Sequence, residues 1–204
     1  GQPTLKNTHP HLSGDICTVH NGIIENYMDL KSYLKKKSFV FKSDTDSEVI
    51  CHLINYYFSK SANMQSAIIS TANSLEGSYA LAAINAQTPH TIYSACKGSP
   101  IILGKDVSSN YISSDMTPIV DHTKNYIPMD DNEFSEISSS DIKIFNKNKR
   151  VLSKPTKVSK INKNQASLMG HKHFMHKEIY EQKAIIEDMI NRYCLLYTSD
   201  AADD

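Results

Sequence analysis

Apolar residues recur every three or four positions in four stretches of this chain, a spacing that predicts amphipathic helices. Asn26 has the side chain of a helix N-cap at the start of the first stretch. Thr45 and Glu48 have capping-box spacing at the start of the second, and Gly77 follows the third as a helix-ending glycine. The predicted helices span residues 26–37, 46–59, 64–75 and 174–191.

Short apolar runs predict strands in much of the remaining chain. Residues 16–19 are typical of a buried strand, and the Asn21-Gly22 pair after them is expected to break that strand. Helices followed by short strands and tight turns predict an α+β domain with layered antiparallel sheets. The other predicted strands span residues 39–41, 79–84, 91–95, 101–103, 111–113, 126–128, 133–137 and 142–145.

The composition narrows the range of functions. The 204-residue chain has no formal net charge, so nucleic-acid binding has no electrostatic support, and no apolar run reaches membrane-spanning length. Four widely spaced cysteines indicate reduced thiols in a cytoplasmic protein. Two groups of histidines lack further ligands at zinc-binding spacing, so we predict no metal or cofactor. The cysteines are Cys17, Cys51, Cys96 and Cys194. The two histidine groups are His9 with His11, and His171 with His173 and His176.

Candidate chemistry lies where the first strand meets the first helix. Asn21 offers a side-chain amide and Gly22 a backbone N–H, and two convergent neutral donors suit a tetrahedral oxyanion. The alternative is a plain Asn-Gly turn, although no second alternating strand follows to make a hairpin. Asp46 lies at the start of a helix beside a strand edge, where its carboxylate could bind a substrate ammonium group. Helix capping is the alternative for Asp46.

Taken together, the motifs resemble the glutaminase domain of type 2 glutamine amidotransferases. A closing run narrows this resemblance to glutamine–fructose-6-phosphate aminotransferases, and the joint order and spacing of the motifs are specific although each motif alone is weak. The motifs are His9-Pro10-His11, His20-Asn21-Gly22-Ile23-Ile24-Glu25-Asn26, Ser43-Asp44-Thr45-Asp46-Ser47-Glu48-Val49-Ile50, Leu75-Glu76-Gly77-Ser78-Tyr79-Ala80-Leu81, Lys97-Gly98-Ser99-Pro100 and Ser114-Asp115, and the closing run is His176-Lys177-Glu178-Ile179-Tyr180-Glu181-Gln182.

The resemblance implies an N-terminal-nucleophile hydrolase-like fold, a four-layer αββα sandwich that is incomplete at the N-terminus here. It implies that Asn21 and Gly22 form the oxyanion hole and that Asp46 binds the α-amino group of glutamine. The family's nucleophile is an N-terminal cysteine, which this sequence lacks, so we expect the fragment to be inactive. The expected partners are glutamine and, only through the absent isomerase domains, fructose 6-phosphate. The intact enzyme is expected to be a homo-oligomer without nucleic-acid or membrane partners.

The resemblance also predicts how the chain is divided. Residues 1–146 are expected to form a partial glutaminase domain, 147–173 its end and a linker, and 174–193 a helix leading towards isomerase domains. Residues 194–204 resemble a translated sequencing adaptor and are expected to be an artefact. Two alternatives stay open: a glutaminase domain like that of amidophosphoribosyltransferase, which the turn at 97–100 and the closing run disfavour, and a non-catalytic glutamine-binding remnant.

Overall fold

The structure is a computed structural model that describes residue 2, residues 4–161 and residues 170–200. The chain divides into two compact units, Gly1–Lys160 and Ile161–Asp204, and each is described by itself. The first unit holds the predicted sheets. The second contains the helix α5 (Phe174–Asp200), which begins where the sequence predicts and continues past the predicted end at 191.

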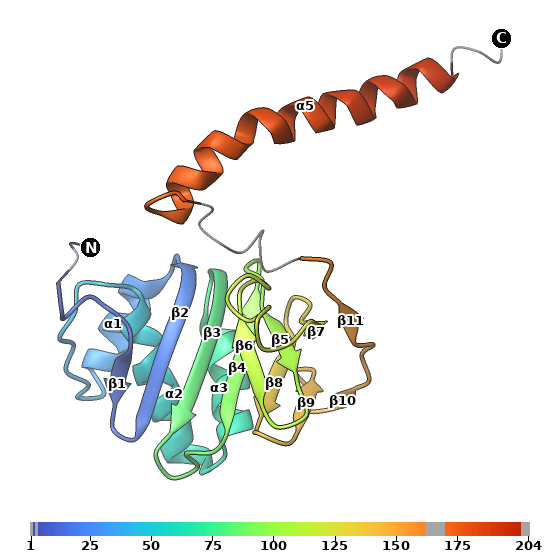
Figure 1. The fold of residues 1–204 in the computed structure, drawn as a ribbon. Coiled ribbons are helices and arrows are strands. Elements are labelled where there is room, and N and C mark those ends of the chain that lie inside the picture. Colours follow the sequence, from blue (N-terminus) through green and yellow to red (C-terminus); the bar gives the residue numbers. More distant parts are fainter. Residues whose placement is uncertain (1, 3, 162–169, 201–204) are drawn as a thin grey trace. The chain divides into compact units, whose positions relative to one another are not determined.

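Two antiparallel sheets form the body of the first unit (Figure 1). The larger has the order β1-β2-β3-β4-β8-β9-β10, and the smaller has the order β11-β7-β5-β6. The seven strands predicted between residues 79 and 145 are all present, with ends that shift by at most two residues. The larger sheet comprises β1 (His11–Ser13), β2 (Ile16–Ile24), β3 (Gly77–Asn85), β4 (Ile92–Lys97), β8 (Phe134–Ile137), β9 (Ile142–Phe145) and β10 (Val151–Leu152), and the smaller β5 (Ile102–Lys105), β6 (Asn110–Ser113), β7 (Asn125–Pro128) and β11 (Lys157–Val158).

Three helices cover one face of the larger sheet, as Figure 1 shows, and their positions confirm the helical pattern of the sequence. They are α1 (Tyr27–Lys35), α2 (Ser47–Ser61) and α3 (Met64–Ser74). Fully buried side chains such as Leu53 of α2, Ile68 of α3 and Ile16 of β2 fill the helix–sheet interface. Removing this apolar surface from water is the main favourable contribution to the layer's stability.

A second apolar cluster joins the two sheets. Leu103 of β5 and Ile127 of β7 pack against Ile137 of β8 and Ile144 of β9. The described residues of the first unit therefore form helix, sheet and sheet layers, and the predicted α+β class with antiparallel sheets is confirmed. The three helices described in this unit all lie on the same side of the larger sheet, so these are three of the four layers implied by the resemblance.

The face of the larger sheet opposite the helices is uncovered near β1 and β2. Side chains alternate between the two faces of a strand. Val19 and Ile23 of β2 therefore share the face away from the helices, where they are 45% and 67% exposed, and Leu12 of β1 is 67% exposed. A row of exposed apolar residues on a sheet face is typical of a surface that another layer covers. That a further segment completes the core there stays a prediction.

The structure corrects the prediction for Asn21-Gly22. The pair does not break the strand, because β2 continues through Ile24, with Asn21 opposite Ala80 and Gly22 opposite Tyr79 on β3. Gly22 adopts φ 126°, which glycine tolerates, so the strand continues through a backbone conformation that L residues rarely adopt. Hydrogen bonding to β3 thus overrides the local turn preference.

Residues 39–41 form no strand in the structure, which corrects a second prediction. The apolar alternation of Phe39 and Phe41 has another cause, since both rings pack around the imidazole of His52, with centroid separations of 5.2 and 4.5 Å. The segment lies over helix α2 and does not pair with a neighbouring strand. Short apolar runs fit either kind of packing.

The predicted caps are placed differently as well. Asn26 occupies the N-cap position of α1 but makes no capping bond, and its amide bonds Ser74 O and Glu76 N–H instead. It therefore joins α1 to the start of β3. Thr45 and Glu48 form no capping box, because Asp46 is the N-cap residue of α2 and Glu48 bonds backbone groups further upstream.

Residues 147–160 belong to the first compact unit. They include β10 and β11, and Lys154 Nζ reaches Asp130 Oδ2 at 2.8 Å and Glu133 Oε2 at 2.7 Å. The segment predicted as the end of the domain and a linker is thus, up to Lys160, part of the folded unit. Residues 162–169 of that prediction lie outside the described residues, and so do 201–204 of the predicted adaptor-derived end.

Candidate functional site

The candidate site begins at the free edge of β2. Strand β1 pairs with residues 16–18 of β2, so beyond Thr18 this edge has no neighbouring strand among the described residues. The Ile24 N–H on this edge donates to Asp46 Oδ2 at 2.8 Å. The Asp46 carboxylate therefore occupies a position that a neighbouring strand would otherwise fill. Asp46 occupies the N-cap position of α2, but its side chain makes no cap bond to the helix.

Gly22 lies at the same edge, two residues before Ile24, whose N–H points towards Asp46. Gly22 lines the same pocket as Asp46. The Asn21 side chain lies on the sheet face away from the helices, is exposed, and makes no hydrogen bond to other residues that the structure describes.

Two neighbouring pockets divide the predicted site residues between them. The first, of about 250 Å³, brings Gly22 and Asp46 together. Its charged groups are acidic, which suits an ammonium group. The second, of about 180 Å³, contains Asn21, His9 and His20. The first pocket is lined by Gly22, Ile23, Ile24, Tyr27, Asp44, Thr45 and Asp46.

A buried histidine connects β2 to the helix that follows Asp46. His20 Nδ1 lies 3.1 Å from Ser47 Oγ, and both residues are buried. Burial lowers the pKa of His20, and the nearby Asp46 carboxylate opposes this shift only in part. His20 is therefore neutral at pH 7. No role for His20 was predicted from the sequence, although its place directly before Asn21 was a usable signal.

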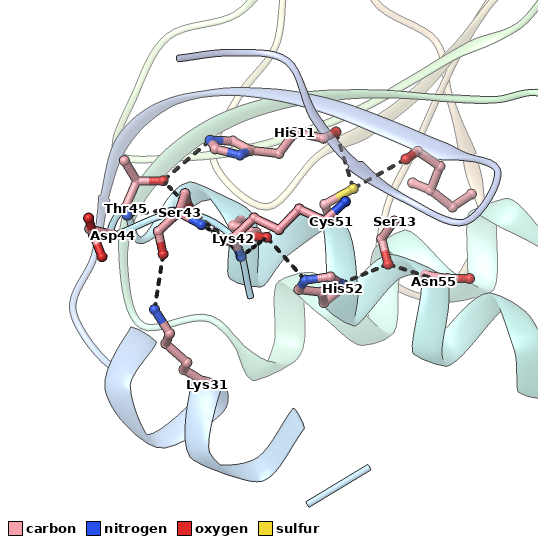
Figure 2. A network of polar contacts seen from close by, with 12 residues as sticks. His11, Ser13, Lys31, Lys42, Ser43, Asp44, Thr45, Cys51, His52 and Asn55 are labelled. Carbon is pink, nitrogen blue, oxygen red and sulfur yellow. Dashed lines mark hydrogen bonds and ion pairs between the residues drawn. The ribbon is translucent and has the colours of Figure 1, made fainter. Parts of the chain in front are cut away.

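The segment before Asp46 is held by a buried carboxylate. Glu48 Oε2 accepts the Ser43 N–H at 2.7 Å and the Ser43 hydroxyl at 2.7 Å, and Glu48 Oε1 accepts the Lys42 N–H at 2.9 Å. Thr45 Oγ1 lies 3.0 Å from Ser43 Oγ and 3.3 Å from His11 Nε2. Figure 2 shows the labelled members of this network between β1 and α2. Together these contacts fix residues 42–45.

His52 extends the network to β1. Ser13 Oγ accepts an N–H of Asn55 and lies 2.7 Å from His52 Nδ1, and the tautomer of the ring sets which of these two groups donates (Figure 2). Nε2 lies 3.4 Å from Glu48 Oε1, a contact that does not meet hydrogen-bond geometry. Burial lowers the pKa of His52 more than Glu48 raises it. Ser13 is buried, so this Ser–His–Glu group is structural and not an accessible nucleophile.

The cysteines whose side chains are described are protonated at neutral pH. Burial raises the pKa of the Cys51 and Cys96 thiols to about 12, and it also raises the pKa of Cys17. A thiol attacks as the thiolate, so these three groups are poor nucleophiles. The described residues contain no cluster of three or more His, Cys, Asp or Glu side chains that could hold a metal ion. Within the same residues, no helix has the length and hydropathy needed to cross a bilayer.

Comparison with protein families decides the classification. Residues 2–121 match the family described as "Glutamine amidotransferase domain", which is more than half of the chain. The chain belongs to this family. The matched region contains the uncovered edge of β2, Asp46 and the network around Glu48, so the candidate site lies wholly within the amidotransferase domain.

The relatives agree with this assignment. This chain is 39% identical over 195 residues to a glutamine–fructose-6-phosphate aminotransferase (isomerizing) from Clostridium acetobutylicum, covering 94% of this chain and 32% of that protein. It is 38% identical to the enzyme of the same name from Aquifex aeolicus, covering 98% of this chain and 34% of that protein. The chain thus spans about a third of the length of these relatives.

A solved structure supports the fold. This chain superposes on glutamine phosphoribosylpyrophosphate amidotransferase from B. subtilis with a TM-score of 0.61, at 20% identity, over 72% of this chain and 33% of the other. At this identity the match shows the fold alone. It confirms the fold class inferred from the sequence motifs, which is the N-terminal-nucleophile hydrolase type.

Proposed function

We propose that this chain is the glutamine-binding part of the glutaminase domain of a glutamine–fructose-6-phosphate aminotransferase. The single observation that carries the proposal is the pocket where the Asp46 carboxylate lies beside the open backbone edge at Gly22. The names of the relatives support this choice, since both full-length enzymes are aminotransferases of this type. In the longer protein, the domain would release ammonia from glutamine for transfer to fructose 6-phosphate.

The two neighbouring pockets together offer complementary groups to the two ends of glutamine. Asp46 is partly buried at the start of α2, and a partly desolvated carboxylate binds an ammonium group more strongly than an exposed one does. The Gly22 N–H and the unpartnered Asn21 amide would stabilise the oxyanion that forms when the glutamine amide is attacked. Gly22 allows close approach because it has no side chain.

The nucleophile would come from an N-terminal cysteine, which is not part of this 204-residue sequence. The protonated state of Cys17, Cys51 and Cys96 makes none of them a substitute. We therefore propose that the 204-residue polypeptide alone binds glutamine without hydrolysing it. We also propose a cytoplasmic location and an oligomeric full-length enzyme. A preceding domain segment, the 147–173 boundary region and the adaptor-like origin of 194–204 stay predictions.

Titration of the isotope-labelled chain with L-glutamine, followed by amide NMR, tests the binding proposal. We expect shifts at Gly22, Ile24 and Asp46, and much weaker binding of glutaramate, which differs from L-glutamine by lacking the α-ammonium group. In Asp46→Asn the preference for L-glutamine over glutaramate should fall by about tenfold, because a charge-assisted hydrogen bond is lost. A folded chain that binds neither compound, or both equally, would overturn the proposed site. Ammonia release above a no-protein control would overturn the proposed inactivity.

A further inference from the structure

Glu48 is a charged group placed inside the fold, and among the described residues it has no ionised partner at neutral pH. It is 4% exposed, and the imidazole 3.4 Å away is neutral because burial lowers the pKa of His52. A carboxylate in such a position is stable only when hydrogen bonds replace its water. Glu48 obtains them from backbone and hydroxyl donors of Lys42 and Ser43.

These bonds also determine the ionisation state of the carboxyl group. Burial alone would raise the pKa of Glu48, but the donors at Lys42 and Ser43 outweigh it, and the pKa lies below its ordinary value. Glu48 is therefore ionised at pH 7. Hydrogen bonds to a charged acceptor are stronger than those between neutral groups, so the carboxylate holds the upstream backbone firmly.

The held backbone leads directly to Asp46. Ser43 is fixed by Glu48 at one end of the segment, and Ser47, the first residue of α2, begins the helix at the other. Three residues separate these points, so the position of the Asp46 carboxylate beside Ile24 N–H depends on both. Thr45 adds a side-chain contact to Ser43 within the segment.

We propose that Glu48 is a positioning residue for the ammonium subsite, because its carboxylate holds residues 42–45 so that Asp46 reaches Ile24 N–H and faces the pocket beside Gly22. The inference deepens the proposed glutamine site and rests on it for the identity of the ligand. It assigns Glu48 no contact with the ligand and no catalytic step. Its structural part, the coupling of Glu48 to Asp46, can be measured without any ligand.

The Ile24 amide is the reporter for this coupling. Its proton bonds the Asp46 carboxylate at the edge that no described strand covers, so its exchange with solvent reports on that bond. Ala82 on β3, paired with both Val19 of β2 and Ser94 of β4, serves as an internal reference for opening of the whole sheet. The ratio of the Ile24 rate to the Ala82 rate therefore separates a local effect from a general loss of stability.

The experiment compares hydrogen exchange in the full chain and four variants. Asp46→Ala defines the complete loss of the bond, and Glu48→Gln keeps the shape of the side chain while removing its charge and adding a donor that opposes those of Lys42 and Ser43. Asn63→Ala is the control, because it removes the exposed N-cap of α3, whose Oδ1 accepts the Ser66 N–H away from the site. Ser43→Ala removes one of the bonds to Glu48 and serves as a milder variant should Glu48→Gln fail to fold.

We expect the Ile24-to-Ala82 ratio to rise at least tenfold in Asp46→Ala and in Glu48→Gln, by a smaller factor in Ser43→Ala, and by less than twofold in Asn63→Ala. An unchanged ratio in folded Glu48→Gln would overturn the inference. If Glu48→Gln does not fold, an unchanged ratio in Ser43→Ala would overturn it. An equal rise in Asn63→Ala would do so too. The proposed function is judged separately, since failure of the wild-type chain to bind L-glutamine would overturn it whatever the exchange ratio shows.

Discussion

A Cβ atom added to Gly22 would lie 2.2 Å from the backbone carbonyl oxygen of Ser78 on the neighbouring strand. Backbone atoms of a paired strand cannot move aside as a flexible side chain can. Gly22 is therefore required by the packing of β2 against β3. Because glycine has no side chain, the backbone at the edge of the pocket is also left uncovered. This one glycine links the stability of the sheet to the geometry of the proposed oxyanion site.

Gly22→Ala should destabilise the chain by about 3 kcal/mol or more, because φ 126° is unfavourable for alanine and the methyl group collides with β3. Gly98→Ala is a suitable comparison. Gly98 has φ 67°, in the left-handed region, and a Cβ added there would meet only Ser78, with Cβ at 3.0 Å and Cα at 3.6 Å, so the change should cost about 1 kcal/mol. Urea unfolding of both variants measures the difference. Equal costs would show that the close approach at Gly22 is not rigid.

Asn21→Ala should leave stability nearly unchanged and should reduce turnover. The side chain is exposed and makes no hydrogen bond to other described residues, so the fold loses little. In a longer protein that contains this chain and an N-terminal cysteine nucleophile, glutamine hydrolysis should fall by about a hundredfold or more, as loss of one oxyanion donor typically causes. Steady-state ammonia release together with thermal unfolding tests this. An unaltered kcat would remove Asn21 from the site.

Acid should weaken the fold in two stages. The folded-state pKa values of His11, His20 and His52 lie below the ordinary 6.5, so the unfolded chain binds more protons and stability is lost as pH falls from about 7 through these values. Glu48 acts in the same direction at lower pH, because its folded pKa lies below 4.5. The urea midpoint should therefore be lower at pH 5.5 than at pH 7.5. A midpoint that rises on acidification would contradict the buried, neutral histidines.

Lys154→Met should destabilise the first unit by about 1–3 kcal/mol, because it removes the ion pair with the buried Glu133 carboxylate. Glu133 would then keep the hydrogen bond that it accepts from the Asp130 N–H. Lys143→Met is the matched control. Lys143 is half exposed and lies 3.7–3.9 Å from its acidic partners, so its loss should cost less than about 0.5 kcal/mol. Similar urea midpoints for the two variants would show that residues 147–160 are peripheral to the folded unit.

Much of the fold could be predicted because the relevant signals are local. The strands between residues 79 and 145 are short apolar runs that end near turn residues, and the third helix has both its periodicity and its end within one stretch of sequence. The order and spacing of the motifs were also sufficient to indicate the family. None of these inferences depended on which distant segments become neighbours in the fold.

The tertiary structure decided the points that depend on distant partners. Asn21-Gly22 has the composition of a turn, yet pairing with β3 keeps it in a strand. Asp46 has the position of a cap, yet its carboxylate bonds Ile24, 22 residues earlier in the chain. Glu48 and His52 are four residues apart, so the sequence indicates that they are neighbours on a helix. The sequence does not show that Glu48 is buried against residues 42–43 or His52 against Ser13.

By itself, the sequence determined the local backbone preferences, the family and the residue types available to the site. The folded chain decided which of those residues meet. The physical reason is that backbone preferences arise between adjacent residues, whereas hydrogen bonds such as the one from Ile24 to Asp46 form only after β2 and α2 have been packed together by the apolar core.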